Sequence, residues 1–317
     1  MNKILITGAT GFVGAAVCRL LREKGHVLSG TTRKGDRRAG PGNVPLYHVP
    51  EIGPDTEWSH PVSGADVVIH LAARVHVMKD QQADPLAASR RVNTEGTRKL
   101  AETAAAAGVK RFIFVSTTKV MGKLSGDRPF SENDKAQPEG AYGISKWEAE
   151  QVLRNIGRST AMETVIVRPP LVYGPGVKGN FLNLLKACEN GWPLPLGRVE
   201  NSRSLIYVDN LAGAINICLD HSGAAGQTYF VSDGNDVSTP ELIRRIAKAL
   251  GRRENMINLP LSGLKAAGLL TGKSAAIGRL TGSLTVDSAK IRSETGWSPA
   301  CSMTEGLKAT AEWYLGK

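Results

Sequence analysis

The segment Gly8-Ala9-Thr10-Gly11-Phe12-Val13-Gly14 decides the fold. It follows the apolar run Lys3–Thr7, which predicts a buried strand, and it leads into Phe12–Glu23, where apolar residues recur with helical spacing. A glycine triplet alone is weak evidence, but between a strand and a helix it is typical of a dinucleotide-binding turn. The glycines let the backbone turn tightly and approach a pyrophosphate, whose charge a helix N-terminus favours.

The alternation of strand and helix continues through the first half of the chain. Further strands are predicted at His26–Thr32, Ala65–Leu71, Arg111–Ser116 and Thr164–Arg168, and helices at Val92–Ala107 and Tyr142–Ile156. Strands that alternate with helices predict an α/β fold with a Rossmann-type, doubly wound parallel sheet. We therefore expect residues 1–170 to form an NAD(P)-binding Rossmann domain.

The local composition changes after Arg168, where turn-forming Pro and Gly residues become frequent. Helices are predicted again at Asn210–Asp220, Thr239–Leu250 and Met303–Tyr314. The last two begin after Ser238 and Ser302, each of which stands three residues before a glutamate, as in a capping box. Residues 171–317 are expected to form mainly a smaller α/β substrate-binding domain, while roughly residues 201–235 return to the sheet.

Composition excludes several classes of protein. The net charge is +11, but the basic residues are spread along the chain without the interleaved aromatics of a single-strand binding surface, so no nucleic-acid partner is expected. The four cysteines are scattered and no histidine cluster has metal-ligand spacing. Free thiols and no metal site are therefore predicted.

Hydropathy predicts a cytoplasmic protein. The apolar run Ile4-Leu5-Ile6 is too short for the core of a signal peptide. The longest weakly apolar stretch, Leu261 to Leu284, is interrupted by cations and glycines and cannot span a bilayer. We expect this stretch to cap the active site rather than touch a membrane, because no clean amphipathic face emerges from it.

Tyr142 and Lys146 are the candidate acid–base pair. Their i, i+4 spacing places both side chains on one helix face. A phenol with a pKa near 10 is a poor catalyst at neutral pH, and a nearby ammonium is expected to lower that pKa. Thr117, at the end of the strand Arg111–Ser116, is positioned to hydrogen-bond the reacting oxygen together with Tyr142.

The end of the second strand bears on the choice of cofactor. An acidic residue there would bind the adenosine ribose hydroxyls and repel a 2′-phosphate. This chain has Thr32 at that position, followed by Arg33 and Lys34. The sequence therefore favours NADP(H), with NAD(H) as the alternative.

The order of these motifs resembles the extended short-chain dehydrogenase/reductases, and more narrowly the NAD-dependent epimerase/dehydratase family that modifies nucleotide sugars. The resemblance rests on Gly8–Gly14, His70-Leu71-Ala72-Ala73, Asn93, Val115-Ser116-Thr117, Tyr142 with Lys146, and the run from Arg168 to Gly176. It implies catalysis by Thr117, Tyr142 and Lys146, a UDP-sugar substrate and a homodimer. The cofactor-binding residues expected from the motifs and the resemblance are Gly8, Thr10, Gly11, Phe12, Val13, Gly14, Thr32, Arg33, Glu51, Ile52, Leu71, Ala72, Ala73, Asn93, Lys146 and Pro169. The substrate-binding residues expected are Arg74, His76, Thr117, Tyr142, Asn180 and Arg203.

Three reactions of that family compete. The 4,6-dehydratases carry Asp-Glu directly after the catalytic threonine, whereas this chain has Thr118-Lys119, which disfavours dehydration. The closer resemblance is to bacterial O-antigen enzymes, which include 4-reductases of UDP-4-keto-6-deoxy-N-acetylglucosamine and UDP-glucose or UDP-N-acetylglucosamine 4-epimerases. With Thr32-Arg33 favouring NADPH, the prediction is a C4-ketone reductase, and the alternative is an NAD-dependent UDP-sugar 4-epimerase. A non-catalytic dinucleotide-binding regulator is the alternative of another class, which the presence of both Tyr142 and Lys146 disfavours.

Overall fold

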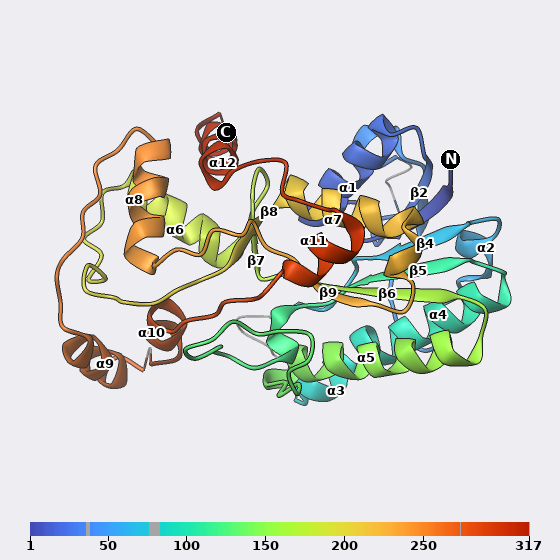
Figure 1. Cartoon of the computed structure of the whole chain (residues 1–317), viewed down its shortest axis with the longest axis horizontal. Coiled ribbons are helices and arrows are strands. Elements are labelled where there is room, and N and C mark those ends of the chain that lie inside the picture. Colours follow the sequence, from blue (N-terminus) through green and yellow to red (C-terminus); the bar gives the residue numbers. More distant parts are fainter. Residues whose placement is uncertain (36–38, 76–82, 273, 317) are drawn as a thin grey trace.

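Seven parallel strands form the central sheet, in the order β3-β2-β1-β4-β5-β6-β9. The computed structural model describes residues 1–35, 39–75, 83–272 and 274–316 (Figure 1). The strands of the sheet are β1 (Lys3–Thr7), β2 (Val27–Thr32), β3 (Leu46–His48), β4 (Val67–His70), β5 (Arg111–Val115), β6 (Glu163–Arg168) and β9 (Thr228–Phe230). The order reverses between β1 and β4, which is the topological switch point at which such sheets bind ligands.

Helices cover both faces of the sheet, so successive residues of the inner strands are all buried. In β1, Ile4 and Ile6 pack into one hydrophobic core while Leu5 packs into the other. The first core includes residues of α1 (Phe12–Glu23) and α7 (Val208–Asp220). The second is closed by α4 (Gly96–Ala106) and α5 (Gly140–Ser159), below the sheet in Figure 1. Burial on both faces explains why these strands read as continuous apolar runs.

The helix that precedes β5 is longer than the sequence predicts. α3 (Pro85–Arg90) runs into the π-helical segment η2 (Arg91–Glu95) and then into α4 without a break. Asp84 caps this run by accepting hydrogen bonds from the N–H groups of Leu86 and Ala87, at 3.0 Å each. A π-helical turn places an extra residue in the helix, and such turns are frequent at functional sites.

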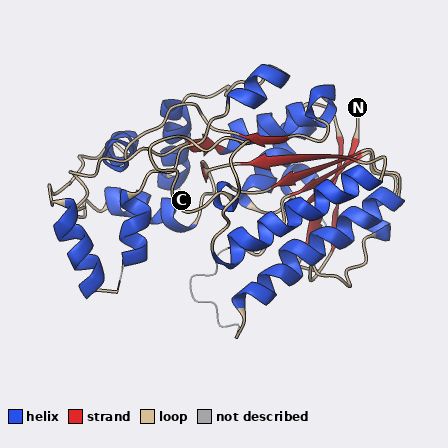
Figure 2. Ribbon diagram, turned by 60° about the horizontal axis from the view of Figure 1, so that its bottom comes forward, coloured by secondary structure: helices blue, strands red, loops and turns tan. Residues whose placement is uncertain are grey.

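The second half builds a smaller lobe beside the carboxyl ends of the strands (Figure 2). β7 (Leu171–Tyr173) and β8 (Leu205–Tyr207) form a separate parallel pair, and β9 joins the main sheet next to β6. The other elements of this half are α6 (Gly179–Glu189), η4 (Ser222–Ala224), α8 (Thr239–Ala249), α9 (Leu261–Leu270), α10 (Ser274–Thr281), α11 (Ala289–Thr295) and α12 (Met303–Leu315). Among the described residues, no helix is long and apolar enough to cross a membrane.

The two predicted capping boxes have different outcomes. At α12 the Ser302 hydroxyl accepts from the Glu305 N–H while the Glu305 carboxylate accepts from the Ser302 N–H, so the box is complete. At α8 the Ser238 hydroxyl accepts from the N–H of Glu241, but the Glu241 carboxylate pairs with Arg245 at 2.8 Å. The competing guanidinium one turn along the helix explains why only half of that box forms.

Four short elements of the first half were not predicted from the sequence, for a common reason. The remaining elements of the first half are η1 (Pro41–Asn43), β3, α2 (Ser59–Val62) and η3 (Thr118–Val120). Each has only three or four residues, which is too short for a hydrophobic period to emerge.

Candidate functional site

The turn between β1 and α1 has the geometry of a dinucleotide cradle. Gly8 has a φ of +70°, which side chains rarely tolerate. A Cβ on Gly14 would lie 2.1 Å from the Gly8 carbonyl oxygen, so only glycine lets α1 pack this close to the turn. Gly11 is the N-cap of α1 and offers no side chain, which leaves the first N–H groups of the helix for an anion. The turn therefore fits a pyrophosphate, while Thr10 and Gly11 are exposed and Phe12 and Val13 are half-buried beside it.

A buried polar chain supports the neighbouring strand end. His70, at the end of β4, contacts the Thr7 hydroxyl through Nδ1 at 2.6 Å and the Thr97 hydroxyl through Nε2 at 3.0 Å. Burial lowers the pKa of this imidazole to about 3, so it stays neutral at physiological pH. The Thr7 hydroxyl also accepts from the N–H of Ala72 at 3.2 Å. These bonds hold residues 71–73 against Gly8, whose added Cβ would lie 3.0 Å from the Ala72 nitrogen.

Asn93 fixes the same segment to the catalytic helix. It lies in the π-helical turn η2 and is 1% exposed. Its side-chain oxygen accepts from the Arg74 N–H at 2.8 Å, and its amide group donates to the Arg74 carbonyl and to the Ser145 hydroxyl, each at 3.0 Å. Asn93 therefore joins the β4 end to α5, which is a positioning role beside the predicted cofactor contact.

The adenosine end of the predicted site is open and carries no acid on β2. Thr32 is buried and its hydroxyl accepts from the Lys34 N–H at 3.1 Å, while Arg33 is exposed. Glu51 borders a cavity of about 300 Å³ and its carboxylate lies 3.5 Å from the Arg91 guanidinium. Ile52, next to Glu51, is buried in the core.

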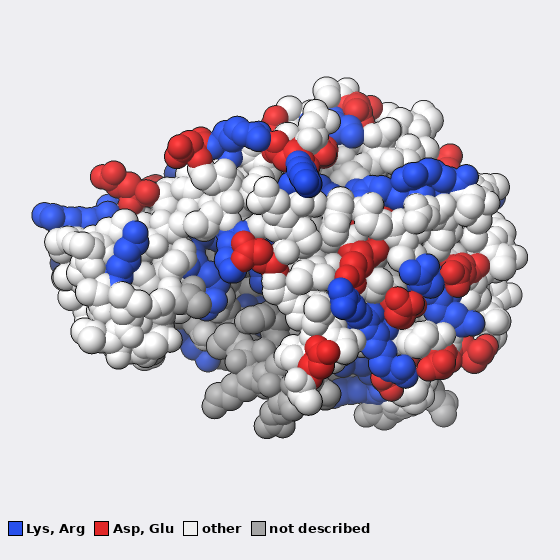
Figure 3. All heavy atoms as spheres, turned by 90° about the horizontal axis from the view of Figure 1, so that it is seen from below, with Lys and Arg blue, Asp and Glu red and all other residues white. Residues whose placement is uncertain are grey.

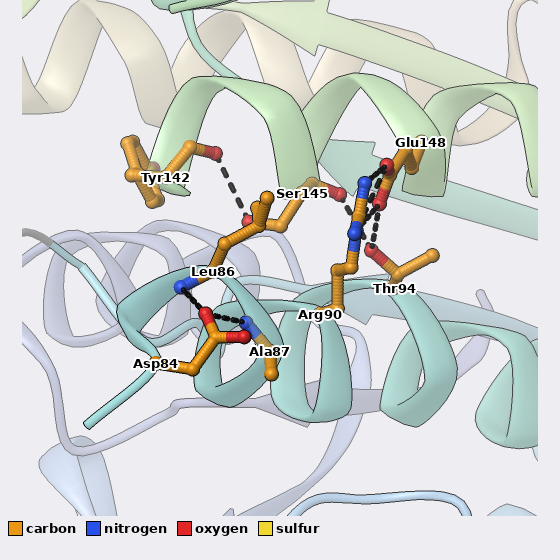
Figure 4. A network of polar contacts seen from close by, with 8 residues as sticks. All are labelled: Asp84, Leu86, Ala87, Arg90, Thr94, Tyr142, Ser145 and Glu148. Carbon is orange, nitrogen blue, oxygen red and sulfur yellow. Dashed lines mark hydrogen bonds and ion pairs between the residues drawn. The ribbon is translucent and has the colours of Figure 1, made fainter. Parts of the chain in front are cut away.

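The helix α5 carries Tyr142 and Lys146 on one face, as predicted from their spacing. Figure 4 shows how α5 is held against the helix that begins with α3. The Thr94 hydroxyl donates to the Ser145 carbonyl at 3.0 Å, and the Ser145 hydroxyl donates to the Tyr142 carbonyl at 3.1 Å. Arg90 forms a bidentate contact with Glu148, with an Nη2–Oε1 distance of 2.6 Å. The first turns of α5 are thus fixed in place by bonds to η2 and α3.

Burial shifts the pKa values of both candidate catalytic groups. Lys146 is 2% exposed, donates to the Val115 carbonyl oxygen at 2.8 Å, and burial lowers the pKa of its ammonium to about 7. Burial also raises the pKa of the Tyr142 phenol to about 12. The expected lowering of the phenol pKa is therefore wrong for this arrangement, because the ammonium is directed at the Val115 carbonyl and desolvation dominates at the phenol.

Thr117 lies two residues after the end of β5 and beside the same helix. Its backbone is extended, its hydroxyl accepts from the Lys119 N–H at 3.3 Å, and the adjacent Thr118 N–H donates to the Pro169 carbonyl at 3.1 Å. Pro169 directly follows β6 and is buried, and its carbonyl holds the Thr117 segment in place through the bond from Thr118. The Lys119 ammonium lies 5.6 Å from the centroid of the Tyr142 ring, which places the Thr117 segment next to the phenol.

Three cations gather around this point. The half-buried Arg203 donates through Nη1 to the carbonyls of Arg279 and Gly282, at 2.8 and 2.9 Å. Surrounding protein and the charge of Arg279 both lower the pKa of the Lys119 ammonium, although its side chain remains accessible to solvent. Within the described ranges, no carboxylate lies in ion-pairing distance of Lys119, Arg203 or Arg279. Figure 3 shows lysine and arginine side chains in the hollow between the two lobes.

Arg279 and Lys119 are candidate functional residues that the sequence analysis did not assign. Arg279 lies in α10, far from the recognised motifs, and its place is shown by the bond from Arg203 to its carbonyl and by the effect of its charge on the pKa of Lys119. For Lys119 a signal existed, since a lysine directly follows the hydroxyl-rich strand end.

The remaining predicted substrate residues are less well connected. Asn180 is exposed in the first turn of α6 and makes no side-chain hydrogen bond within the described part of the chain. The Arg74 backbone is held by Asn93, as described above. His76 lies outside the described residues.

A buried ion pair behind the catalytic helix also escaped the sequence analysis. Glu150, fully buried one turn after Lys146, binds Arg168 of β6 with Nη2–Oε2 and Nε–Oε1 distances of 2.6 and 3.0 Å. The Glu150 carboxylate also acts on Lys146 by raising its pKa, against the larger effect of burial. An acid and an arginine that lie 18 residues apart give no pairing signal in the sequence.

The sequence matches a known protein family over most of its length. Residues 4–232 match the model of the NAD dependent epimerase/dehydratase family. The chain belongs to this family. A UDP-glucose 4-epimerase of Vibrio cholerae is 43% identical over 99% of this chain and 96% of its own length. The N-acetyl-alpha-D-glucosaminyl-diphospho-ditrans,octacis-undecaprenol 4-epimerase of Escherichia coli O157:H7 is 27% identical over 98% and 95%.

Solved structures agree with the fold. The UDP-glucuronic acid 4-epimerase of Bacillus cereus in complex with NAD superposes with a TM-score of 0.79 at 22% identity, over 98% of this chain and 96% of that one. At this identity the likeness shows the fold alone. The family match and the 43% identical relative make the chain a nucleotide-sugar-modifying enzyme of the extended short-chain dehydrogenase/reductases that uses a nicotinamide dinucleotide.

Proposed function

We propose that this enzyme is a UDP-sugar 4-epimerase that retains NAD through its catalytic cycle. The observation that carries the proposal is that Tyr142, Lys146 and Thr117 lie near three cations, Lys119, Arg203 and Arg279, none of which has a carboxylate in ion-pairing distance among the described residues. Arginine forks suit phosphate oxygens, so these cations fit the diphosphate of a nucleotide sugar placed beside the acid–base groups. The 43% identity to the Vibrio cholerae epimerase, over almost the whole of both chains, favours epimerisation over the reduction that the sequence favoured.

In this mechanism Thr117 holds the 4-oxygen of the sugar by a hydrogen bond and Tyr142 exchanges the proton of that oxygen. A nicotinamide dinucleotide held at the glycine turn and by Lys146 would supply reversible hydride transfer at C4, so the reaction would be an isomerisation with no net change in the cofactor. Lys146 keeps one N–H on the Val115 carbonyl and has further N–H groups for a ribose hydroxyl. The pKa of Tyr142 near 12 means that the phenol starts protonated, so its deprotonation depends on positive charge brought near it.

An NADPH-dependent reductase of a 4-keto sugar is the second candidate. It is favoured by the end of β2, where Thr32 replaces the acid that would repel a 2′-phosphate and Arg33 is exposed. A protonated Tyr142 is also the form that donates a proton to a ketone oxygen after hydride transfer. Cytoplasmic location and a homodimer remain predictions from the sequence.

One experiment separates the candidates. Purified protein is incubated with UDP-glucose or UDP-N-acetylglucosamine and NAD, and in parallel with a UDP-4-keto sugar and NADPH. Epimerisation without net change in the cofactor is expected, and stoichiometric oxidation of NADPH with no epimerisation would reject the epimerase in favour of the reductase. Tyr142→Phe is expected to retain dinucleotide binding while turnover falls at least about a hundredfold, as for loss of a general acid–base catalyst. Near-normal turnover would reject the role of Tyr142.

A further inference from the structure

The outer face of α9 exposes leucines that nothing in the described chain covers. Leu269 and Leu270 are 75% and 89% exposed, and Leu261 is 40% exposed. Lys265 and Leu269 are spaced i and i+4, so they lie along one stripe of the helix, and Leu270 follows Leu269. Leu264 and Gly268 are buried on the side that also carries Leu261, away from Leu269 and Leu270, and an added Cβ on Gly268 would lie 2.5 Å from Ile277 of α10.

The segment that carries this face has only one sign of charge. From Leu259 to Val286 the sequence contains no Asp or Glu, while it contains Lys265, Lys273 and Arg279. In Figure 1, α9 lies at the end of the smaller lobe, farther from the sheet than α10. The front of this lobe in Figure 3 is largely uncharged, with isolated cations. We refer to Lys265, Leu269 and Leu270 as the α9 face.

We infer that the α9 face docks on the surface of an anionic lipid bilayer. Leucines at the end of a short helix can enter the boundary between headgroups and acyl chains, while a lysine one turn away extends its ammonium to the lipid phosphates. The absence of acidic side chains removes the repulsion that anionic headgroups would otherwise meet. The inference does not depend on which sugar reaction the enzyme performs.

The chemistry of the face fits a bilayer better than a protein partner. A helix of ten residues is about 15 Å long, and its exposed stripe offers at most a few hundred Å², below the roughly 800 Å² per partner of a stable protein interface. The face also lacks the Trp, Tyr and Arg side chains that anchor such interfaces. A bilayer needs neither a large area nor fixed polar partners.

The position of the face has a consequence for the active site. α10 packs against α9 and carries Arg279, whose carbonyl accepts the bond from Arg203 in the hollow between the lobes. Docking through α9 would therefore hold the diphosphate-binding cations near the bilayer. From the sequence we expected this segment to cap the site rather than touch a membrane, because no clean amphipathic face emerges from it. α10 borders the site, whereas α9 lies farther from the sheet in Figure 1, and the proposal gives α9 the membrane contact that the sequence disfavoured.

Vesicle flotation with the full chain tests the inference. The wild-type protein is expected to float with vesicles that mix phosphatidylglycerol with phosphatidylcholine, and much less with phosphatidylcholine alone. The variant Leu269→Glu/Leu270→Glu is expected to bind the anionic vesicles at least about tenfold more weakly, since one fully buried leucine is worth an order of magnitude or more in a binding constant. The control Leu171→Glu/Leu315→Glu makes the same change of charge at leucines elsewhere that are 40% and 48% exposed. Its affinity for anionic vesicles should stay within about threefold of the wild-type affinity.

The results that overturn the inference are specific. Failure of the wild-type protein to float with anionic vesicles, or equal weakening by the two double variants, rejects docking through the α9 face. Circular dichroism and thermal unfolding establish that each variant is folded, and turnover of soluble UDP-sugar should be retained in both. Light scattering tests the other occupant of the face. If neither the wild type nor any variant floats with anionic vesicles, and Leu269→Glu/Leu270→Glu dissociates an oligomer, then the face joins two copies of the chain and the inference is wrong.

Discussion

Replacing Lys146 by methionine tests how much stability the active site costs the fold. Lys146 is 2% exposed, and its ammonium lies 2.8 Å from the Val115 carbonyl oxygen and 3.6 Å from the centroid of the Phe114 ring. Burial lowers its pKa from 10.5 to about 7. At about 1.4 kcal/mol per unit, this difference corresponds to a cost of about 5 kcal/mol for burying the charge below pH 7, relative to the unfolded chain.

Methionine removes that cost and keeps a similar length. It also leaves the Val115 carbonyl without its donor, which costs about 1–3 kcal/mol. We therefore expect Lys146→Met to be more stable than the wild type by about 2–4 kcal/mol at pH 6. Between pH 7 and 10.5 the unfolded lysine binds a proton that the folded one lacks, so wild-type stability rises with pH in this window. By pH 9 about 3 kcal/mol of the advantage of the variant should be lost.

The assay is urea unfolding of nucleotide-free protein at pH 6 and pH 9. Lys248→Met, at an exposed position of α8, is the control and should change the free energy of unfolding by less than about 0.5 kcal/mol at either pH. The reasoning is refuted if Lys146→Met is less stable than the wild type at pH 6, or if its effect is the same at both pH values. Turnover of the variant should be lost in either case, because the same buried ammonium serves the catalytic site.

Three further substitutions probe the cradle, the ion pair and the cations. Gly14→Ala places a Cβ 2.1 Å from the Gly8 carbonyl oxygen, so calorimetry should show at least about tenfold weaker dinucleotide binding. Gly278→Ala, whose added Cβ would meet no atom within 4 Å, is the control and should bind like the wild type; equal affinities of the two variants would contradict the cradle. Glu150→Gln leaves Arg168 buried without its charge partner and should lower the free energy of unfolding by about 3 kcal/mol; an unchanged value would show that the pair adds nothing. Arg279→Gln should raise the KM for UDP-sugar about tenfold with a smaller change in kcat, and the reverse pattern would argue against diphosphate binding.

Local sequence predicted the elements nearest the cofactor most accurately. β1 and α1 have the predicted bounds, because a continuous apolar run and an uninterrupted helical period leave little ambiguity. The short strands β3, β7 and β8 were not predicted, since three residues carry no period. The run from α3 to α4 was predicted to start too late: the local cap at Asp84 was missed, and the π-helical turn that joins the two helices is bonded to Ser145 of α5, which lies far along the chain.

Some features of the candidate site could likewise be predicted from local sequence, and others could not. Tyr142 and Lys146 could be found because helical spacing alone places them on one face, and the glycines because the close approach of α1 to its turn tolerates no Cβ. The pKa of Tyr142 could not be found, because it depends on how much water the surrounding elements remove. Arg279 could not be found because α10 approaches Arg203 only when the second lobe folds.

The glycine turn, the alternation of strands and helices, and the spacing of Tyr142 and Lys146 were determined by the sequence itself, since each depends on neighbours within a few residues along the chain. The tertiary structure alone decided the cationic cluster, the Glu150–Arg168 pair and the exposed α9 face. These features join residues that are distant in sequence, and their charge and exposure depend on which surfaces the folded chain removes from water.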